Sequence, residues 1–157
     1  MLWFFDLMSN RYLITGLSSW LLAQILKLII YSIVHKEFDI HRLHGDGGMP
    51  SGHSALVSSL ATISALTHGL GSFQFGVTFV LAVIVCHDAT GVRQETGKQA
   101  VIINEIVKAF EELTSEDLPE VKLKEFVGHT PIQVYAGILL GVINAIVQHF
   151  WLWTPMG

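Results

Sequence analysis

Long apolar runs alternate with shorter polar segments along this chain. Residues 12–34 are apolar apart from Lys27 and a few uncharged polar side chains. Residues 132–153 carry no formal charge and end in Trp151 and Trp153. An α-helix needs about 20 such residues to cross the hydrocarbon core of a bilayer, and tryptophan is typical of the membrane interface. The pattern therefore predicts a membrane-spanning helix in each run.

A third apolar region covers residues 54–88 and is interrupted at 69–72 by the sequence Gly-Leu-Gly-Ser. Such an interruption is typical of a tight turn, so this region is expected to form a helical hairpin. Each arm is shorter than a full span, so the hairpin is expected to tilt, to thin the bilayer locally or to be partly re-entrant. Small side chains recur along its first arm and predict a face for close helix packing: Ala55, Ser58, Ser59, Thr62 and Ala65.

The segment at 91–130 is polar, and part of it has the periodicity of an amphipathic helix. One face carries Ala100, Ile103, Val107 and Phe110, and the opposite face carries Asn104, Lys108, Glu111 and Glu112. We therefore expect an all-α fold, an integral membrane helical bundle of about four membrane segments plus this amphipathic surface helix. At 157 residues, the chain is expected to form a single domain over residues 1–157.

The composition supports the membrane assignment. Hydrophobic residues make up 51% of the chain and charged residues 14%, against roughly 25% charged residues in an average soluble domain. The net charge of −4 provides no basic excess for a nucleic-acid backbone, so no nucleic-acid partner is expected. Cys86, the only cysteine, lies in an apolar run and is expected to be a small buried hydrophobe.

The positive charges predict the orientation of the chain in the membrane. Four crossings would place the loops at 35–52 and 91–131 on the same side. Those loops contain every Lys and Arg of the chain except Arg11 and Lys27. Because cytoplasmic loops are enriched in Lys and Arg, that side is predicted to be cytoplasmic, with both chain ends outside.

A glycine-rich segment at 45–54 leads directly into the first arm of the hairpin. Ser51 has the character of an N-cap, Gly52 permits close approach of a ligand to the backbone, and His53 falls in the first turn. The start of a helix attracts anions, and an imidazole there can donate a proton near neutral pH. We predict a phosphate-binding segment; the alternative is a capped helix start without a ligand.

A second group of charged residues follows the second arm of the hairpin. Asp88 ends that arm, and a carboxylate at membrane depth is costly unless it is paired. Arg93 can hold two phosphate oxygens with its planar guanidinium group, and Lys98 can add a point charge. Both cations are therefore candidate phosphate ligands. The alternative is that they anchor the interface by pairing with Asp88 or with lipid headgroups.

The third segment of interest, residues 124–133, leads into the last apolar run. Thr130 and Gln133 have the spacing of a capping box. His129 would then be fixed just before a membrane helix, where its imidazole can attack a phosphate held by helix-terminal amides. The acceptors expected to orient its ring are Asp88 and Glu125.

Two lysines provide further candidate phosphate ligands. Lys27 lies within the first predicted span, on the same helical face as Trp20, Gln24 and Tyr31. A buried ammonium group there requires an anionic partner, unless the side chain extends to the membrane surface. Lys124 lies shortly before His129 and would add a cation to the third segment.

The sequence Pro50-Ser51-Gly52-His53 matches the Pro-Ser-Gly-His signature of the type 2 phosphatidic acid phosphatase superfamily, which also includes vanadium-dependent haloperoxidases. The resemblance implies that His53 protonates the leaving group and that His129 attacks phosphorus. It implies no metal ion and no other cofactor. The chain resembles a divergent branch of that superfamily over nearly its whole length, through further segments at 88–93, 97–100, 123–125 and 128–131.

The chain departs from the superfamily pattern around His129. The superfamily has an arginine six residues before this histidine and an aspartate four residues after it, whereas this chain has Leu123 and Gln133. The superfamily's Lys-Arg-Pro motif is absent as well, so the cations that hold phosphate must come from other positions. The replacements that we infer are Arg93 for the missing arginine and Asp88 or Glu125 for the missing aspartate.

The expected activity is hydrolysis of a lipid phosphomonoester or pyrophosphate through a phosphohistidine intermediate. The expected partners are the lipid phosphate substrate and the bilayer. A homodimer is compatible with the pattern, since four spans are few to enclose a site. Two alternatives stay open: a non-catalytic binder or translocator of phosphate-headed lipids, and a purely structural membrane subunit.

Overall fold

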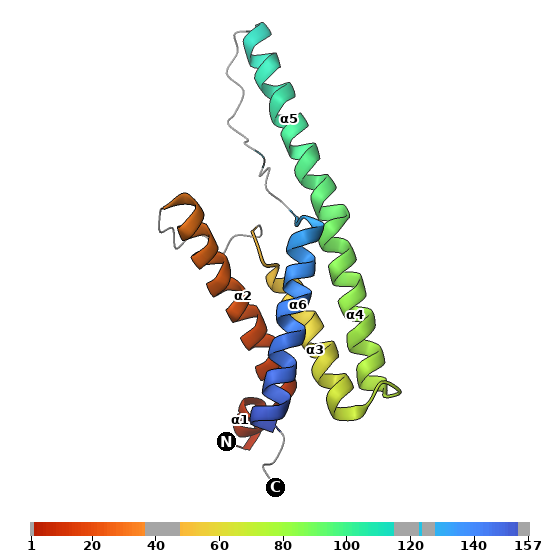
Figure 1. The fold of residues 1–157 in the computed structure, drawn as a ribbon. Helices are drawn as coiled ribbons and strands as arrows, with labels where there is room; N and C mark the ends of the chain where they lie inside the picture. The colour runs from red at the N-terminus through yellow and green to blue at the C-terminus, as the bar shows by residue number, and fades with distance from the viewer. Residues whose placement is uncertain (1, 37–47, 115–122, 124–127, 154–157) are drawn as a thin grey trace.

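The computed structural model describes residues 2–36, 48–114, 123 and 128–153, with the backbone alone at 2, 92–94 and 114. Most of these residues are helical and none of them is in a strand, which confirms the predicted all-α bundle (Figure 1). The helices are α1 (Leu2–Met8), α2 (Arg11–His35), α3 (Gly52–His68), α4 (Phe73–Thr90), α5 (Val92–Thr114) and α6 (Pro131–Gln148), followed by the π-helical turn η2 (His149–Trp153).

Polar side chains fix the residues at which the helices begin. The Asn10 side chain accepts hydrogen bonds from the first backbone amides of α2, and Ser72 caps α4. Ser51 caps α3, as predicted, and the predicted capping box of Thr130 and Gln133 starts α6. The predicted hairpin is also confirmed, because α3 and α4 are separated only by the turn at 69–72.

Helix α3 is the centre of the bundle and packs against α2, α4 and α6 (Figure 1). Its predicted small-residue face contacts two neighbours: Ala55 and Ser58 lie against α6, and Ser59 lies against α2. A Cβ atom on Gly137 would overlap the carbonyl oxygen of Ser51, and one on Gly141 would overlap that of Ala55. The two glycines, four residues apart, thus allow the backbones of α3 and α6 to approach closely, as in other membrane helix pairs.

A buried polar network joins α2 to α6 near the end of the bundle that holds the termini. Thr15 Oγ1 donates to Gln148 Oε1 over 3.0 Å, and Gln148 Nε2 donates to Ser18 Oγ over 2.6 Å. Asn144 Nδ2 donates to Ser19 Oγ over 2.7 Å. Hydrogen bonds between helices in an apolar environment fix their register. The network therefore fixes how α2 and α6 lie against each other.

Three stretches of the described chain are long and apolar enough to cross a membrane: Arg11–His35, Phe73–Leu113 and Pro131–Trp153. At 17 residues α3 is shorter, but it lies among these helices. Large apolar side chains such as Phe79 and Ile143 are about half exposed, as expected of surfaces that face lipid. Helix α5 continues from α4 after Gly91 and extends past the bundle (Figure 1).

The two ends of the bundle are formed by different segments of the chain. The start of α3, the end of α4 and the start of α6 lie together at one end, and both chain termini lie at the other (Figure 1). This arrangement agrees with the prediction that the polar loops share one side. The cytoplasmic location of that side stays a prediction.

Candidate functional site

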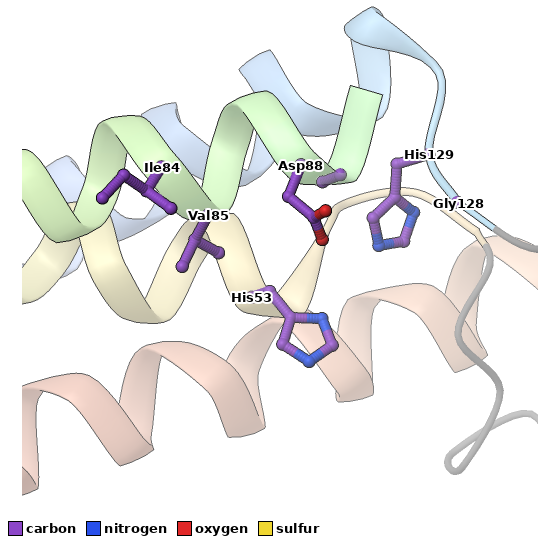
Figure 2. A pocket seen from close by; sticks show the side chains of 7 residues that line it. His53, Ile84, Val85, Asp88, Gly128 and His129 are labelled. Carbon is purple, nitrogen blue, oxygen red and sulfur yellow. The ribbon is translucent and has the colours of Figure 1, made fainter. Parts of the chain in front are cut away.

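Segments from three distant parts of the sequence enclose a cavity of about 220 Å³ at the loop end of the bundle. Figure 2 shows the side chains of His53, Asp88 and His129 turned toward the same space. The rest of the wall is apolar or backbone, so the ionisable groups converge on one small volume. The lining residues are His53, Ile84, Val85, Asp88, Ala89, Gly128 and His129.

His53 owes its position to the anchored start of α3. Ser51 is fully buried. Its backbone amide donates to the Gln133 carbonyl oxygen over 2.9 Å, and its hydroxyl accepts a hydrogen bond from Ser54 Oγ over 3.0 Å. The first turn of α3 is thus tied to the first turn of α6. His53 itself is exposed, so its imidazole is accessible to a ligand or to water.

His129 is held on several sides and is only 4% exposed. Its backbone amide donates to the Ala89 carbonyl oxygen over 3.0 Å, which joins the start of α6 to the end of α4. Gly128, directly before it, has a φ of 89°, a conformation that favours glycine. On the ring, Nδ1 lies 3.3 Å from Gln133 Oε1. The ring is therefore oriented by the residue that stands where the superfamily has its aspartate.

Gln133 has a second role that the sequence analysis missed. Its Oε1 accepts the Thr130 backbone amide over 3.1 Å, as the capping box requires, and the same atom faces His129. The signal in the sequence was the capping box itself, which turns the Gln133 side chain back toward Thr130 and thus toward the adjacent His129. Of the two acceptors predicted for His129, Asp88 lines the same cavity, and Glu125 lies outside the described residues.

Two of the predicted phosphate ligands differ in their exposure: Lys27 is buried and Lys98 is exposed. Lys27 is buried at 6% exposure, and its Cγ lies 3.0 Å from the place that a Cβ on Gly48 would occupy. Its side chain thus runs along the segment that leads into Ser51. Lys98 lies on α5 with its Nζ 2.6 Å from Glu95 Oε1, and both side chains are about 60% exposed.

Two further predicted phosphate ligands, Arg93 and Lys124, are described only in part or not at all. The backbone of Arg93 belongs to the first turn of α5, and its side chain lies outside the described part of the structure. Lys124 lies outside the described residues altogether, as Glu125 does. Among the residues that are described, no group of three His, Cys, Asp or Glu side chains is arranged to hold a metal ion.

A second, apolar groove of about 440 Å³ lies between α3, α4 and α6. Its polar side chains are Ser58, Thr62 and Cys86. The Ser58 hydroxyl is 3.3 Å from the carbonyl oxygens of Ala55 and Ile138, and the Thr62 hydroxyl donates to the Ser58 carbonyl over 2.8 Å. Because these hydroxyls are already hydrogen-bonded, the groove presents a mainly hydrocarbon surface.

Comparisons with known proteins found similarity to a protein family and to a bacterial membrane protein. The model of a family described as the divergent PAP2 family matches residues 8–144. The uncharacterized membrane protein YuiD of Bacillus subtilis (strain 168) is 41% identical over 155 residues, which cover 93% of this chain and 98% of that protein. No solved structure matches the chain.

Proposed function

Because the chain belongs to the divergent PAP2 family, we propose that it is a membrane phosphatase that hydrolyses a lipid phosphomonoester or pyrophosphate. The observation that carries this proposal is the cavity that His53, Asp88 and His129 share. Two imidazoles and a carboxylate around a space of this size suit transfer of a phosphoryl group to a nitrogen nucleophile.

His129 is the proposed nucleophile. The Thr130 amide is a donor, so the Gln133 atom that faces it is the oxygen. That oxygen also faces His129 Nδ1, which therefore carries the ring proton and donates. In this tautomer Nε2 bears the lone pair that can attack phosphorus. Burial keeps the imidazole in one orientation, which favours a near-attack geometry.

The reaction then has two steps. His129 Nε2 bonds to phosphorus as the bond between phosphorus and the lipid oxygen breaks, and protonated His53 gives its proton to the departing oxygen. In the second step, water attacks phosphorus and transfers a proton to His53, while the bond to Nε2 breaks. Inorganic phosphate leaves, and both histidines return to their starting states.

The charges around the cavity support these roles. In the proposed mechanism, the Asp88 carboxylate stabilises the positive charge that develops on the His129 imidazole during the attack. Lys27 and Arg93 are the proposed cations for the phosphate oxygens, together with the amides at the start of α3. Lys27 is supported by its contact with Gly48, and Arg93 by its place directly after α4.

A lipid substrate is favoured over a soluble one by the setting of the site. The cavity lies at the end of helices that are long and apolar enough to cross a bilayer. A phosphate headgroup would reach the cavity while its hydrocarbon chains stay beside the bundle. The apolar groove between α3, α4 and α6 offers such chains a surface without unpaired serine or threonine hydroxyls.

The test is phosphate release by the purified full-length chain from a panel of lipid phosphates in mixed micelles. His129→Ala is expected to abolish release. The matched control is His68→Ala, since His68 lies exposed at the last turn of α3, at the far end of the bundle. Release by His129→Ala at the wild-type rate would refute the nucleophile.

A non-catalytic binder or translocator of phosphate-headed lipids is the second candidate. The observation that favours it is Gln133, because a neutral amide stands where the superfamily has a carboxylate to stabilise a charged imidazole. A binder of this kind would hold lipid phosphate tightly without releasing inorganic phosphate. Its affinity would also be insensitive to His129→Ala.

A further inference from the structure

Gln24 of α2 has a buried acceptor atom that no hydrogen bond within the described residues satisfies. Its side chain is 8% exposed, and its Oε1 makes no hydrogen bond there. A buried polar atom normally has a partner, and a lasting exception in a native structure calls for a specific explanation. A ligand that supplies a hydrogen-bond donor is one such explanation, and the surroundings of Gln24 favour it.

Gln24 faces the segment that forms the start of α3. Its Nε2 lies 3.6 Å from the place that a Cβ on Gly52 would occupy, and Trp20 Nε1 lies 3.4 Å from the same place. Lys27, one turn further along α2, makes the corresponding contact at Gly48. One face of α2 therefore lies directly against the segment that ends in His53. The glycines leave room for these side chains, because a Cβ at either position would crowd them.

We propose that Gln24 is a specificity-determining residue of the phosphate site, with its Oε1 accepting a hydrogen bond from a protonated phosphate oxygen. This inference rests on the proposed function, which places the phosphate at the start of α3. Lys27 and the helix-terminal amides attract any small oxyanion, because they recognise charge and acceptor oxygens. Only an anion with a hydroxyl group can also satisfy Gln24 Oε1.

The chemistry separates two anions of similar size. Inorganic phosphate, like a singly protonated phosphomonoester, carries a hydroxyl on phosphorus at neutral pH, whereas sulfate carries none. Sulfate would therefore bind with Gln24 Oε1 still buried and unpaired. Relative to phosphate, its binding would be weaker by about 1–3 kcal/mol, or roughly 5- to 150-fold in affinity. Gln24 thus selects the protonated oxyanion.

The experiment compares phosphate with sulfate as ligands of the purified full-length chain, by isothermal titration calorimetry and by thermal shift. Gln24→Met keeps the length of the side chain and removes the acceptor, and Gln24→Glu keeps an acceptor. Gln74→Met is the matched control, because Gln74 is exposed in the first turn of α4. The wild type and the control are expected to prefer phosphate. The preference is expected to fall about tenfold in Gln24→Met and to persist in Gln24→Glu.

A purely structural role for Gln24 predicts a different result. Gln24→Met would then lower the unfolding temperature of the ligand-free protein and leave the ratio of phosphate to sulfate affinity unchanged. The proposal predicts an unfolding temperature that is equal or higher, because the buried and unpaired Gln24 Oε1 has been removed. An unchanged ratio in an active Gln24→Met protein overturns this inference alone. A wild-type protein that neither binds phosphate nor releases it from lipids overturns the proposed function as well.

Discussion

The double role of Gln133 gives a prediction in which catalysis and stability separate. Gln133→Leu removes the acceptor of His129 Nδ1 and also one half of the capping box. Thr130→Ala removes the other half of the box and leaves the contact with His129 in place. The backbone hydrogen bond between Ser51 and Gln133 does not involve either side chain, so both variants retain the link between α3 and α6.

The expected magnitudes follow from these contacts. Loss of a helix cap costs about 0.5–2 kcal/mol, so both variants are expected to be destabilised to a similar degree. Only Gln133→Leu leaves Nδ1 of the buried His129 without its amide acceptor, a change worth about 1–3 kcal/mol. If the free energy of the His129 tautomer that carries its proton on Nδ1 rises by this amount, kcat drops by roughly 5- to 150-fold. Thr130→Ala is expected to change kcat by less than about threefold.

The assay is steady-state phosphate release from the preferred lipid phosphate, with the unfolding temperature of each variant measured in the same detergent. KM is expected to stay close to the wild-type value in both variants, since neither side chain is assigned to substrate. Gln133→Glu retains an acceptor and is expected to keep most of the activity. Equal kcat values for Gln133→Leu and Thr130→Ala would show that Gln133 acts only as a cap.

Three further predictions concern packing, charge and orientation. Gly141→Leu forces α6 away from α3 and is expected to cost about 1–3 kcal/mol or more. Gly76→Leu is the control, because a side chain there meets open space, and its unfolding temperature should stay near that of the wild type. Equal losses of stability in the two variants would argue against the close packing of α3 and α6. Asp88→Asn is expected to lower kcat roughly tenfold or more, and full activity would remove Asp88 from the mechanism. In a variant without its native cysteine, an impermeant maleimide added to intact cells should label Leu70→Cys and spare Glu112→Cys, and the reverse result would invert the predicted orientation.

Much of the fold was predictable because it depends on local rules. Each local feature determines the structure of only the few residues around it. These features are the apolar runs, the interruption at 69–72 and the capping residues Ser51 and Thr130. The small-residue face of α3 was predictable for the same reason. Its partner was not identified, although Gly137 and Gly141 have a spacing typical of close helix pairs. Choosing between helix partners requires the three-dimensional arrangement, which periodicity alone does not supply.

Residues of the candidate site could be predicted from the sequence, but the contacts between them could not. His53, Asp88 and His129 were proposed together, and the structure places them around one cavity. Carboxylates are the acceptors that the sequence suggests for His129, because charge is easy to see in a sequence. The structure adds the Gln133 amide, whose contact with His129 depends on the geometry of the capping box. Lys98 was a candidate on charge alone, whereas its exposed pairing with Glu95 is a consequence of their spacing on α5.

The most direct test of the central claim is to trap and map the intermediate. The purified chain would be mixed with lipid phosphate labelled at phosphorus, quenched in alkali within the first turnover and digested for mass spectrometry. The account predicts a base-stable, acid-labile phosphoryl group on His129, absent from His129→Ala and from a reaction followed to completion. Turnover without any label on His129, or a label on another residue, would contradict it.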